Sequence, residues 1–185
     1  MVRRAAVPAE LTRGPFTVAE AERAGLTRRQ LEGRSWRRLG AGLYAWAGLP
    51  DTPALLLAAV QRRLPAGAAF SGRTAAWLHG LDLPPCDPVE VTVPERSGIS
   101  TRAGARVRRA ALPAGDVVTQ RGMPATSPLR TIADLGGSLP LVEAVVVADM
   151  ALQHRLVDEA ALHAYVAAPV RHKGSVRLQQ VVDLA

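Results

Sequence analysis

Hydrophobic and polar positions near the N-terminus follow two short helical patterns that begin ten residues apart. Each pattern starts with a threonine and has Glu or Gln three residues later, in Thr17-Val-Ala-Glu20 and Thr27-Arg-Arg-Gln30. A threonine hydroxyl at such a start accepts the free backbone N–H three residues on, and the Glu or Gln side chain reaches back to the cap. The two motifs therefore predict two helix starts, with Val18, Ala21 and Leu31 facing inward.

A sharp bend and a hairpin are predicted after the first of these helices. Gly25 can take the left-handed conformation that ends a helix, and only Leu26 separates it from the next cap, so the two helices must cross sharply. From Trp36 to Trp46, aromatic and branched residues surround Gly40 and Gly42, a composition typical of a tight two-stranded hairpin. Together these elements predict a winged helix-turn-helix in which the hairpin is the wing.

The pattern changes after Gly48-Leu-Pro-Asp-Thr-Pro53, a segment rich in turn residues that we take as the linker. Thr52 and Pro53 then begin a helix that continues to Arg63, with an apolar face made of Leu55, Leu56, Ala59 and Val60. A second helix is expected from about Gly72, capped by Ser71, to His79.

A small sheet and several helices are predicted for the rest of the chain. The strands are expected at 88–94, 106–112 and 116–123, the last with a hairpin at Arg121-Gly122. Ser127 and Pro128 start a helix that reaches Leu135, and further helices are expected at about 139–154, 158–167 and 175–184. The sequence thus predicts an α+β protein with a winged helix-turn-helix at residues 1–48 and an α/β domain at 53–185.

Composition narrows the class of protein. A chain of 185 residues that is 48% hydrophobic can bury a real core. No run approaches 18 uncharged apolar residues and the N-terminus lacks a signal-peptide core, so we expect a cytoplasmic protein without a membrane segment. Cys86 is the single cysteine, which rules out an internal disulfide, and no His or Cys cluster surrounds it at metal-ligand spacing.

The net charge of +7 is concentrated at the N-terminus. Residues 1–40 hold nine arginines and four glutamates, a balance of +5, whereas residues 41–185 hold 14 basic and 12 acidic residues, a balance of +2. Because 22 of the 23 basic residues are arginine, a GC-rich genome would explain the high overall arginine content without any function. The clustering is the better signal, since it is typical of a phosphate-binding surface.

The second predicted helix and the hairpin carry the candidate DNA-binding residues. Arg28 and Arg29 lie in the first turn, the part of a recognition helix that meets base edges, and a guanidinium can bind guanine O6 and N7 or clamp a phosphate. Gln30 would read adenine if its capping role leaves it free. The expected set is Thr27, Arg28, Arg29, Gln30, Arg34, Arg37 and Arg38. The alternative is a small structural bundle with a solvated arginine face.

The sequence contains few candidate catalytic residues. Asp87 and Glu90 resemble part of a metal-dependent nuclease site, but Thr92 stands where such sites place a lysine. The histidines at 79, 154, 163 and 172 are scattered, and each is interpreted as structural or solvent-facing. There is no Gly-rich phosphate loop and no nucleophile elbow. We therefore expect no enzyme activity, no metal and no cofactor.

Four segments, residues 16–27, 36–44, 71–80 and 126–135, together resemble actinobacterial proteins of the type IV AbiEi-like antitoxin family. The resemblance covers nearly the whole chain. It implies a winged helix that represses its operon by binding operator repeats in double-stranded DNA. It also implies a C-terminal domain that counteracts a nucleotidyltransferase-like toxin without necessarily contacting it. The five arginines between 28 and 38 would be the operator-binding set.

The sequence differs from related sequences of that family in two respects, and more than one function therefore remains possible. Related sequences often have arginine where this chain has Ala41, just before the Gly-hydrophobic-Tyr of the wing. Many relatives also continue into a very-short-patch-repair-like (Vsr-like) endonuclease domain, so this chain is either a stand-alone repressor and antitoxin or the DNA-targeting part of a longer nuclease. A protein-interaction module that does not bind DNA is the third hypothesis. Thr126 to Asp134 is interpreted either as a partner surface or as a capped helix in which Arg130 and Asp134 pair.

Overall fold

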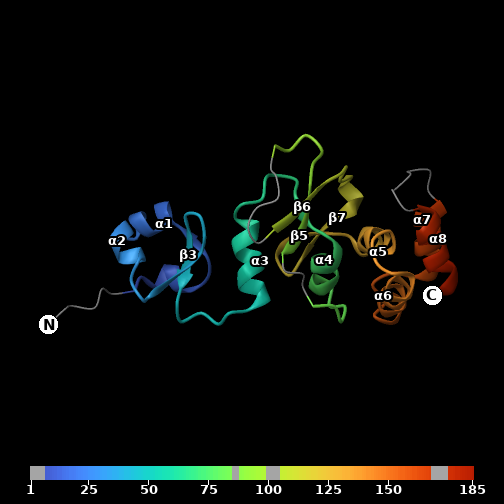
Figure 1. Cartoon of the computed structure of the whole chain (residues 1–185), viewed down its shortest axis with the longest axis horizontal. Helices are drawn as coiled ribbons and strands as arrows, with labels where there is room; N and C mark the ends of the chain where they lie inside the picture. The colour runs from blue at the N-terminus through green and yellow to red at the C-terminus, as the bar shows by residue number, and fades with distance from the viewer. Residues whose placement is uncertain (1–6, 85–87, 99–104, 168–174) are drawn as a thin grey trace. The chain divides into compact units, whose positions relative to one another are not determined.

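A computed structural model describes residues 7–84, 88–98, 105–167 and 175–185, and in it the chain forms two compact units. The first unit is Met1–Leu64 and the second is Pro65–Ala185 (Figure 1). Both units combine helices with a β-sheet, which confirms the predicted α+β class. Within the described residues, we find no helix with the length and hydrophobicity needed to span a bilayer.

The first unit contains two short helices followed by a hairpin, in the predicted order. Its elements are a 3-10 helix η1 (Ala9–Thr12), β1 (Phe16–Thr17), α1 (Val18–Arg23), α2 (Arg28–Leu31), β2 (Trp36–Gly40), β3 (Leu43–Trp46) and α3 (Pro53–Gln61). The three strands form an antiparallel sheet in the order β1-β3-β2. Both predicted capping boxes are present, so each helix start is fixed by its own sequence.

A small core holds this unit together. It consists of Leu11, Phe16, Ala21, Leu26 and Leu31, all buried, with Val18 only partly buried beside them. Phe16 lies edge-on to Trp36, with ring centroids 5.2 Å apart, and stacks on Tyr44 at 6.3 Å. These aromatic contacts join β1 to the hairpin and add to the stabilisation from burial.

Helix α3 belongs by its contacts to the first unit, whereas the expected boundary places it in the second domain. The end of the helix explains the difference, because Arg62 binds Glu20 of α1 and Arg63 binds the turn of the hairpin. Thr52 caps the helix and Pro53 starts it, as predicted. The predicted buried face is wrong at one position, because Leu57 is fully buried and Leu56 is only partly buried. The helix is apolar along nearly its whole length, so its sequence does not show which side faces inward.

The second unit is built on a five-stranded mixed sheet. The strands are β4 (Ala69–Phe70), β5 (Val89–Val93), β6 (Ala105–Arg109), β7 (Val117–Gln120) and β8 (Met123–Thr126), in the order β6-β5-β4-β8-β7. Strands β5 and β6, and β4 and β8, run parallel, and the other two pairs are antiparallel. Arg121 and Gly122, with φ of 51° and 74°, form the predicted hairpin turn between β7 and β8.

Helices pack against this sheet and against one another (Figure 1). They are α4 (Gly72–Leu78), α5 (Pro128–Gly136), α6 (Leu141–Gln153), α7 (Glu159–Ala167) and α8 (Ser175–Leu184), with a 3-10 helix η2 (Ala114–Asp116) before β7. Helix α4 contacts β5, β8 and α5, and α5 contacts the other three helices. The main core lies among these helices and includes Ile132, Leu135, Val147, Leu162 and Val181.

The predicted Ser71 cap of α4 is wrong in its chemistry. Ser71 is the residue before the helix, but its side chain makes no capping bond. The carboxylate of Glu90, from the neighbouring strand β5, accepts the backbone N–H of Arg73 instead, at 2.8 Å. Gly72 permits this approach, because a Cβ there would lie 2.2 Å from Glu90 Oε2. A capping partner 17 residues away cannot be found from local sequence patterns.

Candidate nucleic-acid interface

Helix α2 begins at a position that hydrogen bonds fix on both sides. Gly25, with a φ of 81°, ends α1, and the N–H of Leu26 donates to Ala21 O at 2.9 Å. The N–H of Thr27 donates to Gln30 Oε1 at 2.7 Å, and the N–H of Gln30 donates to Thr27 Oγ1 at 3.4 Å. The first turn of α2 is therefore held in place relative to α1, as a recognition helix requires.

The cap also uses the part of Gln30 that adenine recognition needs. Its Oε1 accepts both the backbone N–H of Thr27 and the Thr27 hydroxyl, the second at 2.9 Å. Reading adenine with a glutamine takes the amide oxygen and the amide N–H₂ together. The capping role thus occupies one half of that pair.

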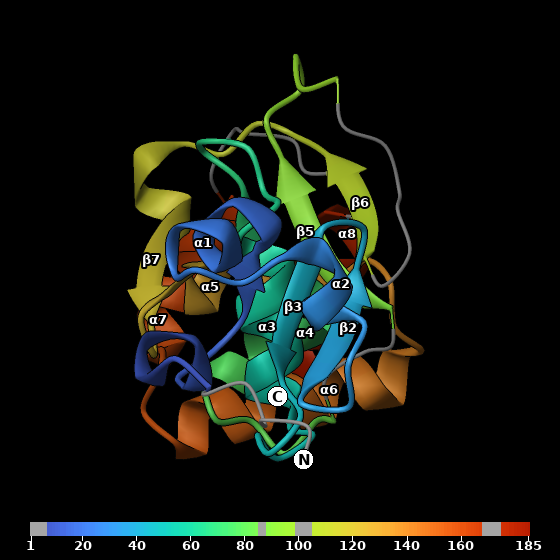
Figure 2. The same ribbon diagram turned by 90° about the vertical axis from the view of Figure 1, so that its left-hand side faces the viewer.

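Arg28 and Arg29 are exposed on the first turn of α2, which Figure 2 shows beside the hairpin. The Arg28 side chain is 81% exposed, and its Nε lies 3.4 Å from Glu22 Oε1. An exposed pair of this kind contributes at most about 1 kcal/mol, so a phosphate or a guanine can replace Glu22 at small cost. Arg34, which follows the helix, is exposed as well.

The two arginines of β2 point to opposite faces of the hairpin, because successive side chains alternate along a strand. Arg37 donates to Leu49 O at 3.4 Å and lies 3.7 Å from Asp51, and only 30% of its side chain is exposed. Arg38 is exposed, and its Nε donates to Gly40 O at 3.3 Å. Arg38 is therefore the more accessible of the two, while Arg37 is tied to the segment that follows the hairpin.

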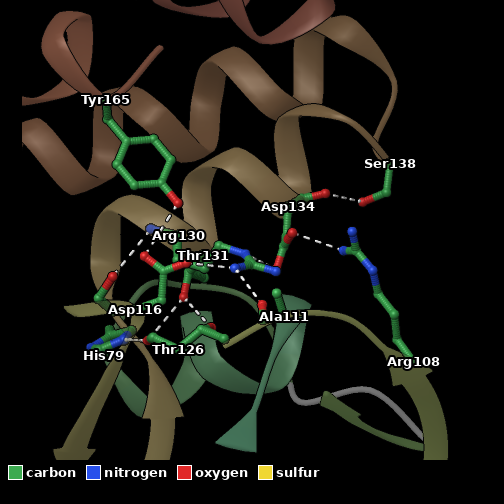
Figure 3. A network of polar contacts seen from close by, with 11 residues as sticks. His79, Arg108, Ala111, Asp116, Thr126, Arg130, Thr131, Asp134, Ser138 and Tyr165 are labelled. Carbon is green, nitrogen blue, oxygen red and sulfur yellow. Dashed lines mark hydrogen bonds and ion pairs between the residues drawn. The ribbon is translucent and has the colours of Figure 1, made fainter. Parts of the chain in front are cut away.

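Arg130 of the second unit is buried in a network of polar contacts (Figure 3). Arg130 of α5 is 2% exposed, with Nε 3.1 Å from Asp134 Oδ2 and Nη1 2.5 Å from Asp116 Oδ2. Nη1 also donates to Ala111 O at 3.2 Å, and Arg108 binds the other oxygen of Asp134 at 2.8 Å. The capped-helix interpretation of this segment is confirmed, since Arg130 is part of the interior.

Two groups of this network, Arg130 and Tyr165, have pKa values above their ordinary ones. Burial alone would lower the pKa of Arg130, but the charge of Asp134 and hydrogen bonds to Asp116 and Asp134 outweigh it and raise the pKa above its ordinary value. Burial and the negative charge of Asp116 raise the pKa of Tyr165 to about 12. The Tyr165 hydroxyl therefore stays protonated and donates to Asp116 Oδ1, at 3.5 Å.

His79 is a buried structural residue next to this network. Its Nε2 donates to the carbonyl oxygen of Thr126 at 2.7 Å, and the Thr126 and Thr131 hydroxyls lie 2.7 Å apart. Burial lowers the pKa of His79, and the hydrogen bond to Thr126 only partly opposes this shift. His79 is thus neutral at physiological pH, as expected for a histidine of the interior.

The nuclease-like residues do not form a metal site among the described parts of the chain. Glu90 uses one carboxylate oxygen to cap α4, and its other oxygen lies 3.2 Å from Arg106. No group of three or more potential metal ligands occurs in the described residues. Asp87, Cys86 and His172 lie outside them.

Comparison with known families identifies the second unit. A family model described as the AbiEi antitoxin C-terminal domain matches residues 67–184. The chain belongs to the AbiEi antitoxin family. The match begins within three residues of the second unit and includes the whole Arg130 network. In this AbiEi-family protein the buried arginine is therefore part of the antitoxin domain, and the exposed arginine set lies outside the matched region.

Comparison with solved structures supports the fold of the AbiEi-family chain. The crystal structure of the RV2827C protein from Mycobacterium tuberculosis is similar, with a TM-score of 0.64 and 19% sequence identity. The likeness covers 92% of this chain and 72% of that one, so it spans both units. At this level of identity it is evidence for the fold alone. A comparison with curated proteins finds no match.

Proposed function

We propose that the first unit is a winged helix-turn-helix that binds operator repeats in double-stranded DNA. The protein would then be a sequence-specific transcriptional repressor as well as the antitoxin of a type IV toxin-antitoxin system. One observation carries the proposal: two adjacent exposed guanidinium groups, Arg28 and Arg29, stand on the first turn of a helix whose start is fixed by a capping box. That geometry suits entry of the helix into the major groove.

The side chains around this turn would have different roles, which follow from their exposure and their present partners. Arg28 and Arg29 would contact base edges, with two hydrogen bonds to guanine O6 and N7 as the preferred geometry. Arg34, Arg37 and Arg38 would contact phosphates on either side, Arg37 after releasing Asp51. Thr27 and Gln30 keep the helix start in place, and the amide N–H₂ of Gln30 can still donate to a base or a phosphate.

The test is the double variant Arg28→Gln with Arg29→Gln, assayed against DNA from upstream of the protein's own gene. Each substitution should cost roughly 1–3 kcal/mol if the arginine binds guanine in the bidentate geometry, so specific binding should be lost. Arg96→Gln is the matched control, because it removes an exposed guanidinium from the second unit. Unchanged operator affinity in the double variant would contradict the assignment.

The antitoxin role belongs, in this proposal, to the second unit, which would act without catalysis or a cofactor. Co-expression with a nucleotidyltransferase-like toxin encoded beside the gene should restore growth. The double variant at 28 and 29 should still restore growth while losing repression, since the two activities lie in different units. Loss of both activities in that variant, with its fold intact, would contradict this division.

A further inference from the structure

The turn of the wing holds a guanidinium group that comes from outside the helix-turn-helix and hairpin. Arg63 follows the end of α3, 22 residues beyond this turn, and its Nη2 donates to Ala41 O at 2.7 Å. The neighbouring Arg62 forms an ion pair with Glu20 of α1 at 2.5 Å. Two side-chain contacts, one to α1 and one to the wing turn, therefore hold the segment that follows α3. This double attachment fixes where the Arg63 side chain lies within the first unit.

Gly40 provides the space that the Arg63 side chain fills. A Cβ at Gly40 would lie 2.6 Å from both Nη1 and Nη2 of Arg63, and the φ of Gly40 is 155°. A side chain at this position would push the guanidinium away. The wing turn therefore accommodates Arg63 because its backbone is bare there.

A second guanidinium group lies on the same turn. Arg38 donates to Gly40 O, and Arg63 donates to the carbonyl oxygen of the next residue, Ala41. Neither arginine is within ion-pair distance of a carboxylate in the described part of the chain, whereas Arg62 is paired with Glu20. The two positively charged guanidinium groups on this turn repel each other. An anion bound between them would relieve that repulsion.

The turn also lies next to the helix pair. The N–H of Val18, the first residue of α1, donates to Gly42 O at 3.2 Å. The charged turn and the start of α1 are thus adjacent, in the same compact unit as α2. A duplex that receives α2 in its groove presents phosphates on both sides of that groove, within reach of neighbouring elements.

We infer that Arg63 and Arg38 together bind a DNA phosphate at the wing turn, which makes Arg63 a DNA-contacting residue supplied by the segment that follows α3. This inference rests on the proposed DNA-binding function and extends it beyond residues 27–38. The turn itself has an alanine, Ala41, at the position that Arg63 contacts. The cation at this turn therefore comes from a residue 22 positions further along the chain.

The test is the salt dependence of operator binding by the full chain with Arg63→Gln. Each phosphate contact contributes about 0.9 to the slope of log K against log salt. The variant should therefore bind about tenfold more weakly than the unmodified chain at 50 mM salt and about threefold more weakly at 200 mM. Arg63→Lys should keep the slope, because it keeps the charge. Arg13→Gln, which removes an exposed guanidinium from the same unit, should change neither value.

The outcomes separate this inference from its alternatives. An equal loss of affinity at both salt concentrations, with a lowered melting temperature, would show that Arg63 only stiffens the wing and would overturn the inference. Unchanged affinity and slope would overturn it too, while leaving the function proposed for Arg28 and Arg29 intact. If the unmodified chain shows no salt-dependent DNA binding, both proposals are overturned together.

Discussion

The arginines of the two units have the same side chain in opposite surroundings. In the first unit Arg28 is 81% exposed and pairs with an exposed glutamate, and Arg29, Arg34 and Arg38 are exposed as well. In the second unit Arg130 is 2% exposed and is enclosed by two aspartates and a backbone carbonyl. The difference shows that burial and pairing, and not residue type, decide whether an arginine is available to a ligand.

The physical reason is the cost of dehydration. A buried guanidinium loses its hydration and becomes stable only when carboxylates and carbonyls replace water, so it cannot exchange them for a ligand. An exposed guanidinium keeps its water and holds its partner weakly, so a phosphate or base can replace that partner. The two units should therefore respond differently to substitutions and to pH.

The largest effect is expected from Arg130→Met, which leaves Asp116 and Asp134 buried without their shared cation. Loss of one partner of a buried ion pair typically costs 3–5 kcal/mol, so we expect the opening free energy of α5 to fall by roughly that amount. Hydrogen exchange of the α5 amides in the full chain measures it. Adding Asp116→Asn and Asp134→Asn should recover part of the loss. A change below about 1 kcal/mol would mean that Arg130 is no more structural than a surface arginine.

Sequence patterns predicted the local features behind this comparison but not the distant ones. The capping boxes, the Gly25 bend and the Arg121-Gly122 turn each depend on residues only a few positions apart, so the sequence shows them directly. The pairing of Arg130 with Asp134 was visible for the same reason, as an i,i+4 pair.

Contacts between distant segments were missed. Asp116 lies 14 residues before Arg130, and Tyr165 lies 49 residues after Asp116, so neither partner leaves a local pattern. Strands β1 and β4 have two residues each, too few to show an alternation of apolar and polar positions. The candidate DNA-binding residues lie on one helix and one hairpin, so local patterns could suggest them. The bond from Arg63 to Ala41 O joins residues 22 positions apart and leaves no such pattern.

The next largest effect concerns the capping boxes of the first unit, which hold its exposed arginines in place. Thr17→Ala and Thr27→Ala each remove a side-chain cap and should lower the free energy of unfolding of this unit by about 1 kcal/mol. In a Trp77→Phe chain, whose remaining tryptophans Trp36 and Trp46 both lie in the first unit, fluorescence during urea unfolding measures the loss. Serine in place of either threonine is the control, because it keeps the capping hydroxyl. Equal stability of the alanine and serine variants would show that the helix starts are held by packing alone.

A smaller effect should distinguish the units by pH. Burial lowers the pKa of His79 below its ordinary value of 6.5, so the unfolded chain takes up a proton more readily than the folded one. The contribution of His79 to stability is therefore complete above about pH 6.5 and is lost as the pH falls towards the folded pKa. Hydrogen exchange in the second unit should detect this decline between pH 7.5 and 5. His79→Gln should remove it, and persistence of the full decline in that variant would exclude His79 as the cause.

The first unit should lose stability only at lower pH. The backbone hydrogen bond from Thr17 is the largest cause that lowers the pKa of Glu20 below 4.5, with the Thr17 hydroxyl and Arg62 acting in the same direction and burial opposing them. Glu20 therefore stabilises the folded unit above about pH 4.5, and this contribution is lost as the pH falls through the folded pKa. In the same Trp77→Phe chain, tryptophan fluorescence should show the acid transition of the first unit at a lower pH than the transition due to His79.

The smallest effect is expected at an exposed arginine of the second unit. Arg106 lies 3.2 Å from Glu90, but its side chain is 65% exposed, so the pair should contribute less than about 0.5 kcal/mol. Arg106→Gln leaves the other oxygen of Glu90 on the N–H of Arg73, and α4 should keep its cap. Hydrogen exchange of the α4 amides compares this variant with Arg130→Met in the same unit. If Arg106→Gln destabilised the unit as strongly as Arg130→Met, exposure would not be what separates structural arginines from those available to a ligand.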